Sequence, residues 1–100
     1  MSYYADSGQR AQLITGLLDL AIFLESSQEV PAPKCATIHV FPESGTDEEQ
    51  RAEIDAIAAF LDAEPGEIVT GHYTASRYFG PVEYRAVAID RNAENSPDGE

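Results

Sequence analysis

The side chains that could perform chemistry are few and lie far apart in the sequence. Histidine occurs twice, at His39 and His72, and cysteine occurs once, at Cys35. A protein metal site needs three or four converging ligands with partners that orient them, but the sequence contains no HxH, HExxH or CxxC spacing. A lone cysteine ahead of a strand is usually packed and inert. The sequence therefore predicts no metal site, no cofactor and no catalytic residue.

Other catalytic patterns are also missing. Ser76 lies outside any G-x-S-x-G nucleophile elbow, and the glycines of the chain form no phosphate-binding loop. Acidic residues are plentiful, so a pair of carboxylates carries little information about acid–base catalysis. We therefore expect a binding module and not an enzyme. The competing enzyme interpretation requires a deep pocket lined by His72, Tyr73 and Arg85.

The charge of the chain is its strongest anomaly. Eighteen acidic residues face six basic ones, giving a net charge of −12, which argues against direct binding to nucleic acid or to an anionic membrane. Most of the acidic residues between 43 and 67 fit a solvated helix face that keeps the protein soluble. The alternative is an acidic DNA mimic that inhibits a nucleic-acid-binding protein by occupying its basic groove. The candidate acidic patch consists of Asp47, Glu48, Glu49, Glu53 and Asp55.

A hairpin over Val69–Ile89 is the element around which the rest of the chain is organised. Gly80 suits the positive φ at the first position of a type II′ turn, and Pro81 suits the second position. If these two residues form the loop, Phe79 faces Val82 and the register is fixed. The side chains that then share the inward face are Tyr73, Ala75, Tyr84, Ala86 and Ala88.

Two helices and one further strand are expected to join this hairpin. The spacing of apolar residues predicts a helix over Gln9–Ser26, and Thr46 with Glu49 forms a capping box that opens a second helix. A short strand is expected over Cys35–Phe41. The stripe on the first helix contains Leu13, Ile14, Leu17, Leu20, Ala21 and Leu24.

This element order predicts a two-layer α+β domain, α-β-α-β-β. A right-handed crossover joins the first two strands, and the return strand Glu83–Ile89 fits between them, antiparallel to both. We expect a three-stranded antiparallel or mixed sheet of order 1-3-2, a split β-α-β, with both helices on one face. The domain is expected to span residues 9–89, between a flexible N-terminus over 1–8 and a disordered acidic tail over 90–100.

The sheet face turned away from the helices is the leading candidate for an interaction surface. A bare and partly apolar face favours association, so we expect a protein partner or a homodimer through this face or through a sheet edge. The alternative is a wet face with scattered apolar side chains. The candidate surface consists of Phe41, Tyr78, Val87 and Ile89, together with Ile22 on the far side of the first helix from its stripe.

The sequence also bears on location. A single cysteine excludes an internal disulfide, and the first ten residues show no basic-then-apolar signal pattern. The apolar stretch Leu17–Leu24 is interrupted by Asp19 and is too short to span a bilayer. A cytoplasmic protein without membrane contact is expected.

A leucine-rich helix, RAQLITGLLDLAIFLE, precedes VPAP, TIHVF and GHYTASRYFGPVEYRAVAI. These segments cover most of Arg10–Ile89 and resemble a group of small uncharacterised proteins from actinobacteria and their phages. In similar sequences the positions of Leu18 and Ile22 are often charged, so their apolar character here favours a contact surface specific to this chain. The resemblance implies a phage or mobile-element origin but no activity, because no function is established for the group.

Overall fold

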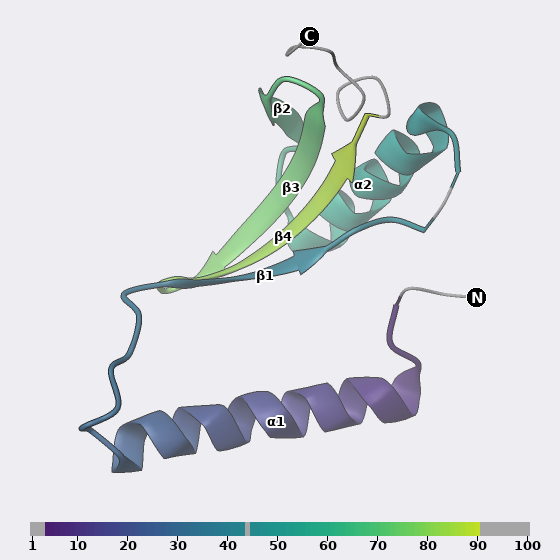
Figure 1. Cartoon of the computed structure of the whole chain (residues 1–100). Coiled ribbons are helices and arrows are strands. Elements are labelled where there is room, and N and C mark those ends of the chain that lie inside the picture. The colour runs from purple at the N-terminus through teal and green to yellow at the C-terminus, as the bar shows by residue number, and fades with distance from the viewer. Residues whose placement is uncertain (1–3, 44, 91–100) are drawn as a thin grey trace, which may run out of the picture. The chain divides into compact units, whose positions relative to one another are not determined.

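The computed structural model describes residues 4–43 and 45–90. Within them the protein is an α+β structure with two helices and a four-stranded mixed sheet (Figure 1). The chain divides after Lys34 into two compact units, which are described separately below. The elements are α1 (Ser7–Ser26), β1 (Ala36–Val40), α2 (Asp47–Leu61), β2 (Gly66–Val69), β3 (His72–Phe79) and β4 (Val82–Ile89).

The first unit contains α1, which begins two residues earlier than predicted. The reason is a capping box: the Gln9 N–H donates to the Asp6 carboxylate at 2.8 Å, and the Asp6 N–H donates to the Gln9 side chain at 3.0 Å. These bonds satisfy two donors at the helix start that have no partner within the helix. None of the helix's residues is buried. The two units are not placed relative to each other, so the expectation that both helices cover one face of the sheet stays a prediction.

The hairpin of the second unit has the register predicted from its turn. Phe79 faces Val82, and further along Ala75 faces Ala86. Gly80 has a φ of 59°, a conformation that glycine adopts without steric cost. The alternation of side chains follows from this register, so the predicted inward face of the hairpin is confirmed.

Two parts of the predicted topology are wrong. The sheet has four strands in the order β1-β4-β3-β2, because the short β2 pairs with the outer side of β3. In addition, β1 runs parallel to β4 instead of antiparallel. Both corrections have one cause. After β1 and α2 the chain enters β2 and not β3. It then reverses direction from β2 to β3 and again from β3 to β4, so β4 runs parallel to β1.

The helix α2 packs on the predicted inward face of the hairpin. Ile54 and Ala58 from the helix form the core together with Ala75, Ala86 and Ala88 from the sheet. The small alanine side chains let the helix approach the sheet closely, and Ile54 is completely buried. The half-buried residues packed around this core are Ile57, Leu61, Tyr73 and Tyr84.

An ionic cluster links α2 to β2, to β3 and to the residue that follows β4. The Arg51 guanidinium lies 3.2 Å from the carboxylates of both Glu67 and Asp90 and sits 4.8 Å above the centre of the Tyr73 ring. The Tyr73 hydroxyl donates to Asp55, and this bond raises the pKa of the tyrosine. Since these groups are partly exposed to water, their contribution to stability is expected to be small beside that of the core.

Replacing Ile54 with Ala should lower the free energy of unfolding by about 2–5 kcal/mol, because the substitution leaves a cavity in the centre of the core. Phe60→Ala on the same helix is the matched control. Its side chain is 87% exposed, so we expect a change within about 0.5 kcal/mol. Urea unfolding followed by circular dichroism measures both, and equal losses in the two variants would contradict the described core.

Candidate interaction surfaces

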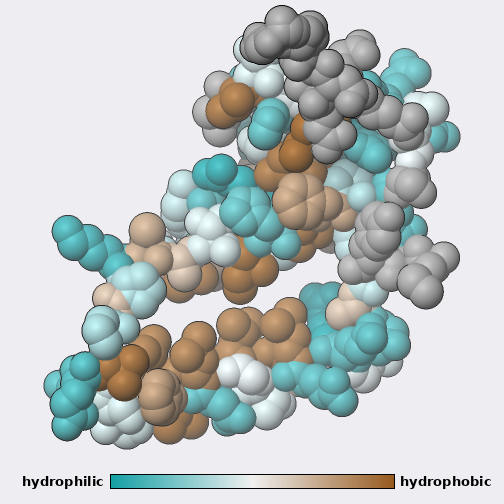
Figure 2. All heavy atoms as spheres, in the orientation of Figure 1, coloured by the Kyte–Doolittle hydropathy of each residue, from teal (hydrophilic) through white to brown (hydrophobic). Residues whose placement is uncertain are grey.

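The helix α1 presents an unusually large set of exposed apolar side chains. Figure 2 shows these apolar side chains along the helix. Exposure of the large ones ranges from 42% to 61%, although monomeric proteins rarely expose contiguous apolar patches of more than a few hundred Å². We define the α1 surface as Leu13, Ile14, Leu17, Leu18, Leu20 and Phe23 with the half-buried Leu24. Ile22 is also exposed but lies on the opposite side of the helix.

Four leucines within the α1 surface form a seam. Leu13, Leu17, Leu20 and Leu24 follow one another at spacings of four, three and four residues. An average spacing of 3.5 residues keeps side chains facing a partner helix in a coiled coil. The seam is shorter than the three or four heptads typical of an independent coiled coil, so its neighbours must contribute to any contact. The sequence contained this signal, but periodicity alone does not distinguish a core from an interface.

In the second unit, the sheet face opposite α2 contains a hollow of about 190 Å³. This volume is below the ≈ 300–1,000 Å³ typical of small-molecule sites. The floor is formed by Thr74 and Val87, which are both buried. The remaining lining residues are His39, Phe41, Val69, His72, Arg85 and Ile89.

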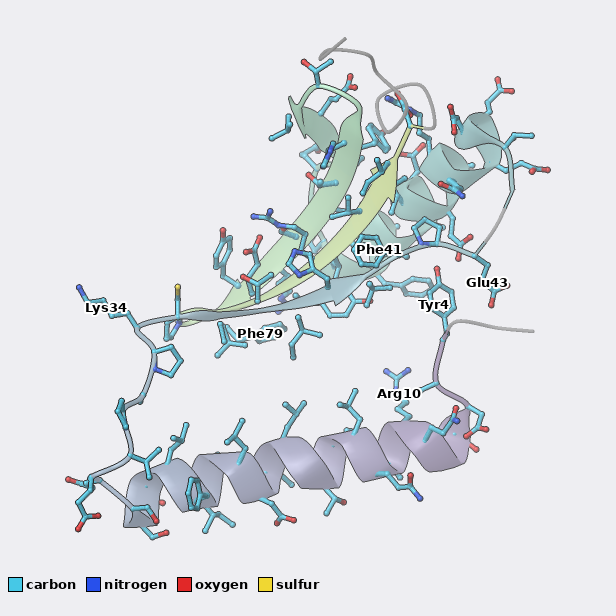
Figure 3. All side chains as sticks on the ribbon, viewed as in Figure 1. Tyr4, Arg10, Lys34, Phe41, Glu43 and Phe79 are labelled. Atoms are coloured by element: carbon cyan, nitrogen blue, oxygen red, sulfur yellow. The ribbon has the colours of Figure 1, made fainter. Side chains whose placement is uncertain are left out.

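The predicted interaction residues are divided between the two units. Phe41, Val87 and Ile89 line the hollow, and Figure 3 shows Phe41 just beyond the end of β1. Val87 is only 5% exposed and offers little area to a partner, whereas Tyr78 is exposed. Ile22 lies in the other unit, on α1, and is exposed there. The candidate surface on the sheet therefore reduces to the rim of the hollow and Tyr78.

The two histidines, His39 and His72, both line the hollow. Among the residues that the structure describes, no group of three or more His, Cys, Asp or Glu side chains could hold a metal ion. The His39 ring stacks on Phe41, with centroids 6.0 Å apart and planes 9° apart. Tyr73, which the enzyme interpretation placed beside His72 and Arg85, packs instead against the core on the opposite face. His72 and Arg85 therefore line the hollow without Tyr73.

A buried carboxylate lies on the same sheet face as the hollow, and sequence reasoning missed it. Glu83 is 5% exposed and accepts hydrogen bonds from the hydroxyls of Ser76 at 2.8 Å and Thr37 at 3.2 Å. The Arg85 Nε–H donates to it at 2.9 Å. The Ser76 hydrogen bond is the largest cause that holds the pKa of Glu83 below its ordinary value, with Arg85 adding to it and burial opposing it. The network joins β1, β3 and β4 through one charge.

Some residues of the candidate acidic patch accept hydrogen bonds within the fold. Glu49 accepts the Thr46 N–H at 2.8 Å in the predicted capping box of α2, which is confirmed. Asp55 accepts the Tyr73 hydroxyl at 2.5 Å. Glu48 is exposed, while Asp47 and Glu53 are half-buried. Glu49 and Asp55 are thus already hydrogen-bonded within the fold.

A scan against protein-family models found no match, and searches of curated proteins and of solved structures returned no similar protein. The resemblance to actinobacterial and phage proteins therefore stays a prediction. In the described part of the chain, neither helix is long and apolar enough to cross a membrane.

The pH dependence of stability should carry the signature of Glu83. Because the pKa of Glu83 is lowered in the folded state, its contribution is complete above the ordinary glutamate value of 4.5 and is lost as pH falls through the folded pKa. We expect Glu83→Gln to weaken the acid-induced loss of stability. Urea unfolding between about pH 3 and pH 7 measures this loss. An exposed control, Glu48→Gln, should follow the wild type, and an unchanged slope for Glu83→Gln would count against the buried network.

Proposed function

We propose that the protein is a small acidic interaction module that self-associates through the α1 surface. The observation that supports this proposal is that a helix of 20 residues has no buried residue while it carries seven exposed large apolar side chains. Most helical stability in proteins comes from packing of an apolar face, so a helix with these side chains is expected to need a packing partner. A second copy of α1 supplies such packing, since the leucine seam is complementary to itself.

The expected association is weak. Covering the exposed half of a leucine is worth roughly 1 kcal/mol, so the seam leucines of two copies supply on the order of 8 kcal/mol. Immobilising two chains costs about 4–15 kcal/mol. Self-association should therefore depend strongly on concentration, and a flanking residue such as Ile14 or Leu18 contributes to whether it occurs.

Charge gives the association a characteristic response to salt. Each copy carries a net charge of −12, and this long-range repulsion is screened as ionic strength rises. Within α1 the acidic residues are Asp19 and Glu25, and neither is part of the leucine seam. Self-association should accordingly become stronger with salt. An acidic DNA mimic behaves oppositely, because its attraction to a basic groove weakens with salt.

Replacing Leu17 with Glu should shift self-association to at least about tenfold higher protein concentration, because it places a charge in the centre of the seam. Static light scattering over a dilution series measures the shift. Thr15→Glu adds the same charge to the opposite side of α1 and is the matched control. Circular dichroism confirms that both variants keep the fold.

Two results would contradict the proposal. One is a monomer mass for the wild-type protein at every concentration and salt level tested. The other is an equal effect of Leu17→Glu and Thr15→Glu, which would show that added charge, and not the seam, controls the association.

A further inference from the structure

The edge strands of the described sheet, β1 and β2, differ in how they are protected against pairing. The strand β2 has four residues, its register shifts between Glu67 and Val69, and it carries the acidic Glu67. Short length, irregular register and charge are the devices by which proteins keep edges from joining. The strand β1 has the sequence ATIHV and regular pairing throughout, without an acidic residue, lysine or proline. Of the two edges, β1 is the one open to another strand.

The hydrogen-bonding groups that β1 presents can be identified from its register. The Ala36 N–H donates to the Pro81 carbonyl at 3.2 Å, so the backbone of Ala36 points toward β4. Because this direction alternates along a parallel strand, the N–H and C=O groups of Ile38 also face β4. Those of Thr37 and His39 face away from the sheet and are available to an added strand.

The side chains and charge of this edge suit a second copy of the chain. Ile38 lies on the α2 side of the sheet but is only half-buried, because α2 packs on β3 and β4. The stretch Val30–Pro42 contains no acidic residue in a chain with 18 of them. Two molecules with a net charge of −12 can approach each other here without placing carboxylates in direct opposition.

We infer that two copies pair their β1 strands antiparallel about a two-fold axis at Ile38. In this register Ile38 faces Ile38 of the second copy, and Thr37 faces His39 of the second copy. Each Thr37–His39 pair exchanges both N–H···O bonds, and the two sheets become one continuous sheet. This contact rests on the proposed self-association and adds a second, independent surface to it. Its occupant is another copy of this protein and not an extended peptide of a different one.

The register can be tested by crosslinking the full chain in a Cys35→Ser background, which removes the exposed native thiol. Oxidised glutathione accepts the electrons of two thiols as they form one disulfide. In the proposed register the two Ile38 Cα atoms lie about 4.5 Å apart, within the range for a disulfide. The Ile38→Cys variant should therefore form a covalent dimer.

Thr37→Cys is the matched control, because its two copies are offset along the strands and lie beyond about 7 Å. We expect it to crosslink at least roughly tenfold more slowly than Ile38→Cys, since the geometry excludes a direct bond. A second variant, His39→Pro in the Ile38→Cys chain, removes an outward N–H at a position where an edge strand tolerates proline. It should abolish the covalent dimer while circular dichroism shows the fold retained.

The outcomes separate the two surfaces. Equal crosslinking by Ile38→Cys and Thr37→Cys, or none by either, overturns the β1 pairing; β1 would then be free or bound by a different protein. If association still responds to Leu17→Glu in that case, the proposed function stands. Conversely, a crosslink that is specific to Ile38→Cys and unchanged by Leu17→Glu supports β1 pairing. If Leu17→Glu also leaves the self-association unchanged, the proposed α1 contact is contradicted.

Discussion

The packing of α2 on a stripe of alanines is the constraint on which the rest of the second unit depends. Ala75, Ala86 and Ala88 reach the same face only because the two-residue turn at Gly80 and Pro81 fixes the hairpin register. A slip of one residue would turn all three to the other face and place charged and polar side chains beneath the helix. The core is small, so a single buried isoleucine, Ile54, carries much of its apolar burial.

The features that could be predicted are those set by local chemistry. The turn at Gly80 follows from backbone preferences, the inward alanines follow from the turn, and the capping box at Thr46 follows from residue spacing. The strand β2 could not be predicted in this way. It has four residues, begins with Gly66 directly after a proline, and becomes a strand by pairing with β3. The direction of β1 relative to β4 depends on that missed strand, so one short element accounts for both topological errors.

The candidate surfaces show a similar limit. The apolar stripe of α1 could be predicted from the spacing of its apolar residues. That spacing does not specify whether the stripe packs in a core or against another molecule. The burial of Glu83 could not be predicted from the sequence, because its partners Thr37, Ser76 and Arg85 come from three different strands. A glutamate in an alternating strand is ordinarily assigned to water. Only the assembled sheet shows that its charge is compensated.

The claim that α1 is stabilised by association is tested most directly by amide hydrogen exchange at two protein concentrations. A helix packed on nothing opens easily and exchanges quickly, whereas the strands β3 and β4 exchange only through opening of the core. The account predicts fast exchange in α1 at low concentration and slower exchange at high concentration, with β3 and β4 unchanged. Protection of α1 in dilute solution equal to that of β3 and β4 would contradict it, because the helix would then be covered within a single chain.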